Sequence, residues 1–149
     1  MSGPNPLSML SVLVVEDNPH SASLLAAILR ELRVGTVHRV ENGEQAMDLL
    51  RAAPEQEDEI AAPKPRFDLV MSDWEMRNGD GLSLLHWVRN SGEVRDASIP
   101  FVMVTGVADR ERVNKAREQG VTDMLVKPFS VEMVARKLLA LFRDRRKSA

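Results

Sequence analysis

The sequence FDLVMSDWEM, residues 67–76, is an apolar run that stops on a carboxylate, Asp73, and passes straight into a polar turn. A short aliphatic run of this kind is typical of a strand buried on both faces of a parallel sheet. In such sheets the ligand site lies just beyond the carboxyl ends of the strands. The sequence therefore places the chemistry of this protein at Asp73.

Three other apolar runs end on polar residues in the same way. Residues 11–15 lead to Glu16 and Asp17, residues 99–104 lead to Thr105 and Gly106, and residues 122–126 lead to Lys127. If these strands are parallel neighbours, three acids, a hydroxyl and an ammonium group meet at one edge of the sheet. Carboxylates placed this close need a cation to remain ionised, and Mg²⁺ is a hard ion that prefers oxygen ligands. The pattern predicts a cation site beside a site for a phosphate-sized anion.

Each of these residues also has an ordinary structural explanation. Acids are common at helix N-termini, Thr105 suits the end of a strand as a β-branched residue, and Lys127 could be a surface lysine. Pro128 favours a functional role for Lys127, because it restrains the backbone immediately after Lys127 and limits where the ammonium group can reach. A fixed ammonium, a hydroxyl and a metal around Asp73 suit a phosphoryl group, since carboxylates can form acyl phosphates.

Five strands alternating with five helices predict a doubly wound α/β fold, with a five-stranded parallel sheet covered on both sides. The expected strands are residues 11–15, 36–40, 67–73, 99–104 and 122–126. The expected helices are residues 19–32, 44–53, 82–90, 108–119 and 131–142. Asn18 and Ser130 are candidate caps at helix starts, and Gly35 is expected to end the first helix.

A chain of 149 residues fits one domain with a substantial core. We expect residues 1–9 to be a flexible lead-in, residues 10–142 the domain, and residues 143–149 a basic tail. Residues 54–66 form an acidic, proline-flanked loop that is long for a compact domain. This loop is either solvated and mobile or a docking element for a partner.

The composition excludes several classes of protein. A net charge of −2 gives no strong field for nucleic acid or an anionic membrane, and the absence of cysteine excludes disulfides and thiolate metal sites. No apolar run approaches the roughly 18 residues that span a bilayer, and the start of the chain does not look like a secretory signal. We therefore expect a cytoplasmic protein.

The set Glu16-Asp17, Asp73, Thr105-Gly106 and Lys127-Pro128-Phe129, in this order, resembles the receiver domain of two-component response regulators, of the chemotaxis-regulator type. The resemblance covers about residues 10–142. It implies a flavodoxin-like sheet with strand order 2-1-3-4-5. It also implies that Asp73 accepts a phosphoryl group from a histidine kinase or a histidine phosphotransfer protein, and that the domain then acts on a downstream protein.

The same resemblance assigns a metal site. Asp17 and Asp73 would ligate Mg²⁺ directly, Glu16 would do so directly or through water, and the backbone carbonyl of Glu75 would complete the protein ligands. Such a domain catalyses its own phosphorylation and dephosphorylation, and it is not an enzyme with a separate substrate.

The resemblance also assigns a switch. Lys127 would pair with the phosphoryl oxygens, and Thr105 would move to bond one of them. Met124 stands where many receivers carry an aromatic switch residue, so we expect it to follow Thr105 inward and give a graded response. Arg77 also departs from the family, since proline is frequent at that position.

Other interpretations stay open at this point. An aspartyl phosphohydrolase would share the nucleophile and Mg²⁺, and Glu75 would be its second acid. A flavin-binding module of the same fold is disfavoured, because Glu16 and Asp17 put negative charge where a phosphate would lie. The domain could stand alone, which we favour, or belong to a larger DNA-binding or enzymatic regulator. It could be a monomer or a dimer that forms on phosphorylation.

Overall fold

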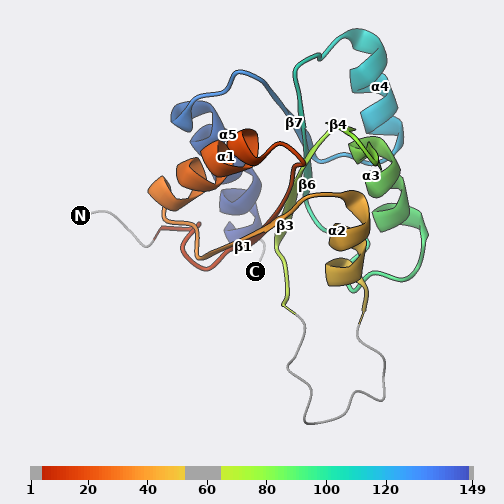
Figure 1. Cartoon of the computed structure of the whole chain (residues 1–149). Coiled ribbons are helices and arrows are strands. Elements are labelled where there is room, and N and C mark those ends of the chain that lie inside the picture. The colour runs from red at the N-terminus through yellow and green to blue at the C-terminus, as the bar shows by residue number, and fades with distance from the viewer. Residues whose placement is uncertain (1–4, 53–64, 148–149) are drawn as a thin grey trace.

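The computed structural model of the chain describes residues 5–52 and 65–147. Its centre is a parallel five-stranded sheet with the order β2-β1-β3-β6-β7 (Figure 1). The strands are β1 (Ser11–Val15), β2 (Thr36–Val40), β3 (Leu69–Asp73), β6 (Phe101–Thr105) and β7 (Asp123–Val126). Numbered within this sheet alone, the order is 2-1-3-4-5, which confirms the predicted doubly wound α/β fold.

Helices cover both faces of the sheet (Figure 1). On one face lie α1 (Pro19–Glu31) and α5 (Val131–Lys147). On the other lie α2 (Gly43–Leu50), α3 (Gly81–Asn90) and α4 (Arg110–Glu118). None of the helices in the described part of the chain is both long enough and apolar enough to cross a membrane.

Alternating residues of the central strands build two separate cores. Val12 and Val14 of β1 belong to the cluster under α1 and α5, while Leu13 and Val15 belong to the cluster under the other three helices. Every residue of β3 and β6 is buried. This double burial explains why the strands read as continuous apolar runs, and it holds their carboxyl ends rigidly.

Several predicted helix boundaries agree with the structure, and others do not. The side chains of Asn18 and Ser130 accept backbone N–H groups as helix caps. The second helix was expected to reach residue 53, but it ends at Leu50, because Arg51 is extended and pairs with Val94 in an isolated antiparallel bridge. The fourth helix begins at residue 110 rather than 108, because the side chain of Asp109 caps it.

The end of α1 also differs from the prediction. Arg33, not Gly35, takes the positive φ of 61° after the helix. Gly35 lies against the chain before β1, where an added Cβ would be 2.6 Å from the carbonyl oxygen of Ser8. Leu7 in this segment is buried, and Asn5 donates a hydrogen bond to the carbonyl of Leu32.

The outer parts of the predicted organisation are therefore only partly as expected. Residues 5–9, expected to be part of a flexible lead-in, pack against the end of α1, and α5 continues to Lys147 through most of the predicted tail. Most of the acidic loop predicted at residues 54–66 lies outside the described residues, so that prediction stands untested.

A tight turn joins β3 to α3 through the small hairpin of β4 (Glu75–Met76) and β5 (Gly79–Asp80). The N–H of Gly81, the first residue of α3, donates to the carbonyl of Trp74 at 2.8 Å. A Cβ on Gly81 would overlap the carbonyl oxygen of Asp73 and lie 2.6 Å from the sulfur of Met103. The position of Asp73 therefore depends on a glycine eight residues later.

This packing predicts that Gly81→Ala destabilises the protein by roughly 1–3 kcal/mol, because the backbone at the end of β3 must move. Gly43→Ala is a matched control, since Gly43 also begins a helix but has open space around its Cα. Urea denaturation of the two variants measures the difference. Equal stability of Gly81→Ala and the wild type would contradict the close approach.

Candidate functional site

The carboxyl ends of β1 and β3 bring the three predicted acids together. Glu16 and Asp17 follow β1 directly, and Asp73 is the last residue of β3. One carboxylate oxygen from each residue lies within 4.8 Å of the others. Glu16 and Asp73 are buried, while Asp17 is half-buried. These positions follow from the parallel pairing of two adjacent strands.

Lys127 reaches this group from the end of β7. Its Nζ lies 2.9 Å from Oδ1 of Asp73 and 3.9 Å from Oε1 of Glu16. The backbone N–H of Lys127 donates to the carbonyl of Thr105 at 2.8 Å, and the Lys127–Pro128 peptide bond is cis. One ammonium group thus pairs with two of the three carboxyl groups.

The pKa of Glu16 reflects both the burial of this group of residues and the charges within it. Burial, together with the neighbouring charges of Asp73 and Asp17, raises the pKa of Glu16 to about 7, even though the ammonium group of Lys127 acts to lower it. A single lysine does not neutralise the cluster, so a second cation would favour the ionised form of Glu16. The donors are all oxygen atoms, which is the set that Mg²⁺ prefers. The residues therefore fit the metal ion that the sequence implied.

The acids line an open cavity of about 340 Å³ above the sheet edge. It is lined by Glu16, Asp17, Asn18, Ser21, Asp73, Glu75, Thr105, Gly106 and Lys127. Glu75, whose backbone carbonyl was predicted to bind the metal, therefore borders the same space. An apolar pocket of about 230 Å³ adjoins it and shares Glu16, Asp73 and Lys127 with it.

The hydroxyl of Thr105 is engaged by groups near α4. It donates to the carbonyl of Val107 at 2.9 Å and accepts from the N–H of the same residue at 3.1 Å. It also accepts from the guanidinium of Arg112 at 3.0 Å. Met124 packs in the core under α2, α3 and α4, opposite Met103 on the neighbouring strand.

Two residues of the site were missed or misjudged from sequence. The sequence placed Arg112 within the expected helix 108–119 without giving it a role, yet it also pairs with Glu75 at 2.6 Å and lies over the ring of Trp74. The sequence feature that could have identified Arg112 is Asp109, a helix cap that places Arg112 in the first turn of α4. Arg77 donates its backbone N–H to Asp17 at 2.8 Å, which a proline at this position could not do.

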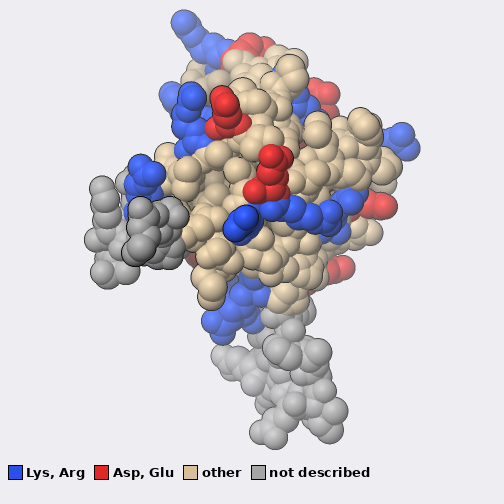
Figure 2. All heavy atoms as spheres, turned by 90° about the vertical axis from the view of Figure 1, so that its left-hand side faces the viewer, with Lys and Arg blue, Asp and Glu red and all other residues tan. Residues whose placement is uncertain are grey.

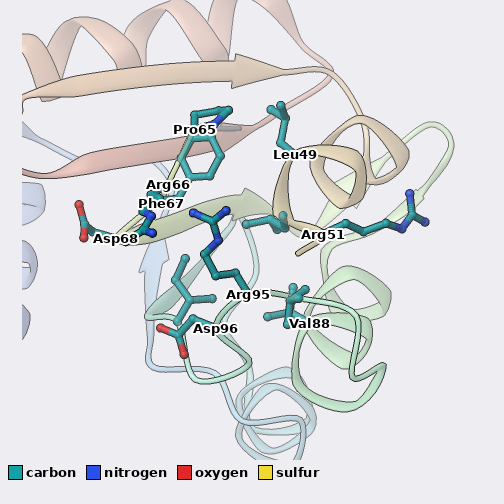
Figure 3. Close-up of a pocket in the computed structure, with 12 residues that line it drawn as sticks. Leu49, Arg51, Pro65, Arg66, Phe67, Asp68, Val88, Arg95 and Asp96 are labelled. Carbon is teal, nitrogen blue, oxygen red and sulfur yellow. The ribbon is translucent and has the colours of Figure 1, made fainter. Parts of the chain in front are cut away.

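A separate pocket of about 140 Å³ lies at the opposite end of β3, near the end of α2 (Figure 3). Arg95 extends across it, while the carboxylates of Asp68 and Asp96 point away from it (Figure 3). Each of these acids accepts a backbone N–H, from Ser11 and Ser98 respectively. With no cluster of acids among its described lining residues, it lacks the chemistry of the first site.

Comparison with known proteins agrees with this geometry. The family model of the response regulator receiver domain matches residues 12–139. Chemotaxis protein CheY-3 of Vibrio cholerae serotype O1 is 28% identical over 133 residues, covering 89% of this chain and 92% of that protein. A probable chemotaxis protein CheY of Rhizobium etli is 29% identical, with the same coverage.

Solved structures are similar as well. Chemotaxis protein CheY4 of Vibrio cholerae superposes with a TM-score of 0.72 at 25% identity, covering 89% of this chain and 98% of that one. The signal receiver domain of a histidine kinase from Syntrophus aciditrophicus gives 0.71 at 28% identity, with 91% of each chain covered.

The raised pKa of Glu16 predicts a pH-dependent stability in metal-free protein. The folded state holds the Glu16 proton more tightly than the unfolded chain, so this group costs stability as the pH rises from about 4.5 through 7. Glu16→Gln should therefore gain about 1–3 kcal/mol over the wild type at pH 8, and little at pH 4.

Urea denaturation in a chelator at both pH values measures this difference. Glu41→Gln, at an exposed acid near the site, is the control and should show no such gain. A Glu16→Gln gain that is equal at both pH values would refute the electrostatic origin.

Proposed function

Because this chain belongs to the response regulator receiver domain family, we propose that Asp73 accepts a phosphoryl group from the phosphohistidine of a kinase or phosphotransfer protein. The observation that carries this assignment is the 2.9 Å contact of Lys127 with Asp73 inside the acidic cavity. Among the described residues, Asp73 is the acid that ends a central strand between Glu16, Asp17 and Lys127.

In the proposed transfer a carboxylate oxygen of Asp73 attacks the phosphorus atom. The phosphorus–nitrogen bond of the donor breaks, and the donor histidine keeps the electron pair and takes up a proton. The product is an acyl phosphate on Asp73. Such transfers depend on positioning and on neutralising the phosphoryl oxygens, and Lys127 is placed to neutralise them.

Mg²⁺, when bound, would supply further neutralisation of the phosphoryl oxygens. Asp17, Asp73 and Glu16 would hold the ion with the backbone carbonyl of Glu75. The N–H of Arg77 fixes the carboxylate of Asp17 from the turn after β3, so one ligand is oriented in advance. A water molecule attacking the same phosphorus would break its bond to the Asp73 oxygen, which keeps the electron pair, and would release inorganic phosphate, so that the free carboxylate is restored.

The alternative of a phosphohydrolase with a separate substrate is weakened by the same contacts. That reaction would use Glu75 as its second acid, but the Glu75 side chain is paired with Arg112 at 2.6 Å. To serve a separate substrate, this carboxylate would first have to leave its charged hydrogen bond with the guanidinium. We therefore retain the signalling role.

The donor would approach through the apolar pocket beside Asp73. This pocket is lined by Leu24, Leu25, Met71 and Phe129, among others, and Leu24 of α1 is 51% exposed. On the face covered by α1 and α5, stretches of uncharged surface lie between groups of charged side chains (Figure 2). Such a surface suits contact with an apolar helix of a partner protein.

Output to a downstream protein, or a dimer formed on phosphorylation, would use another face. Val107 and Val126 are exposed beside α4 and on β7, at 46% and 37%. Thr105 lies between this surface and Asp73, and Met124 lies on the same strand as Val126. A phosphoryl-dependent change at Thr105 would bias the population of the binding-competent state.

Phosphorylation is predicted to depend on Asp73 alone. Incubation with acetyl phosphate and Mg²⁺ should add one base-labile phosphoryl group, which mass spectrometry detects, and Asp73→Asn should abolish it. Asp80→Asn is the control, because it removes a nearby acid while asparagine preserves the cap of α3. Undiminished incorporation of the phosphoryl group in Asp73→Asn would refute the assignment of Asp73 as the phosphoacceptor.

Mg²⁺ binding is predicted to change the fluorescence of Trp74, which follows Asp73 directly. Asp17→Asn should weaken the apparent affinity by on the order of 10–100-fold, since loss of a ligand costs at least as much as loss of a hydrogen-bonded neighbour. Trp87→Phe can remove the second tryptophan as background. A titration unaffected by Asp17→Asn would place the ion elsewhere.

A further inference from the structure

Arg112 of α4 connects three parts of the candidate site. One terminal nitrogen of the guanidinium donates to Oγ1 of Thr105 at 3.0 Å, and the other terminal nitrogen donates to the carboxylate of Glu75 at 2.6 Å. The guanidinium carbon lies 4.9 Å from the ring centre of Trp74. The side chain is only 25% exposed, so these contacts are partly shielded from water.

These contacts use all of the hydrogen-bonding positions of the Thr105 hydroxyl. A hydroxyl has one proton to donate and two lone pairs to accept with. Thr105 donates to the carbonyl of Val107, and it accepts from the N–H of Val107 and from Arg112. To donate to a phosphoryl group on Asp73, it must give up its bond to Val107 and turn away from Arg112.

We propose that Arg112 is a positioning residue of the phosphorylation switch, which holds Thr105 toward α4 while Asp73 is unphosphorylated and frees α4 when Thr105 turns. This inference rests on the function proposed above. It gives Arg112 the coupling role that the sequence suggested for Met124, whose side chain packs in the core under α2, α3 and α4.

The geometry requires an arginine at this position, and another positively charged side chain could not replace it. A planar guanidinium can bond Thr105 and Glu75 at once while its face covers Trp74. The ammonium group of a lysine is a compact point charge and cannot make this set of contacts from the same position. Glu75 and Trp74 lie within two residues of Asp73, so the guanidinium bridges the phosphoacceptor strand and Thr105.

The test compares phosphorylation rates with acetyl phosphate and Mg²⁺. Removing one charged hydrogen bond should raise the population of the turned Thr105 state, so Arg112→Gln should be phosphorylated roughly 3–10 times faster. Arg112→Lys should also be faster than the wild type. Lys115→Gln is the matched control, since Lys115 lies on the same helix, pairs only with Glu111 in the described part of the chain, and is exposed.

A double-mutant cycle separates this role from general stability. If Arg112 acts through Thr105, Arg112→Gln should have no further effect on the rate in a Thr105→Ala background. In a Trp87→Phe background, Trp74 fluorescence should change on phosphorylation in the wild type and already be shifted in unphosphorylated Arg112→Gln. An undiminished acceleration in the Thr105→Ala background would overturn the proposal.

Two other outcomes would also overturn it. A slower rate in Arg112→Gln, restored by Arg112→Lys, would mean that Arg112 acts only as a nearby charge. Equal rates in the wild type and both variants would mean that Arg112 does not hold Thr105. Failure of the wild type itself to incorporate a phosphoryl group would instead refute the proposed function, so the two failures are distinguishable.

Discussion

Three carboxyl groups held within 4.8 Å of one another, with one lysine to balance them, are the constraint on which this site depends. The sheet imposes it, since Glu16 follows β1 and Asp73 ends the adjacent strand β3, so they cannot move apart without disturbing the core. The raised pKa of Glu16 reflects the burial of its carboxyl group first and the neighbouring carboxylates second. A cluster with this excess of negative charge could hold a metal ion.

The surrounding structure keeps the cluster in place from several directions. Full burial of β3 and β6 makes the sheet edge rigid, and the closeness of Gly81 to the carbonyl of Asp73 sets the turn that follows. The N–H of Arg77 then holds Asp17 from that same turn. The stability of the buried sheet and of this turn thus holds like charges close together, which is typical of functional sites.

The contact between α4 and the site has a different character. The helix carries few buried side chains, with Ala116 as its fully buried residue, and its first turn touches the site mainly through Arg112. A helix with little apolar anchoring can shift at small cost, so polar contacts at its start weigh more in its position. This makes the Arg112–Thr105 hydrogen bond a credible point of control.

The sequence by itself determined the fold class, the strand order through family resemblance, and the residues of the acidic cluster, because apolar runs and terminal polar residues are local signals. Helix caps such as Asn18 and Ser130 were also readable for that reason. Only the tertiary structure decided where α2 stops, since Arg51 pairs with Val94 more than forty residues away. It likewise decided the roles of Gly35, packed against the segment before β1, and of Arg112. These depend on contacts between distant segments, which no local pattern encodes.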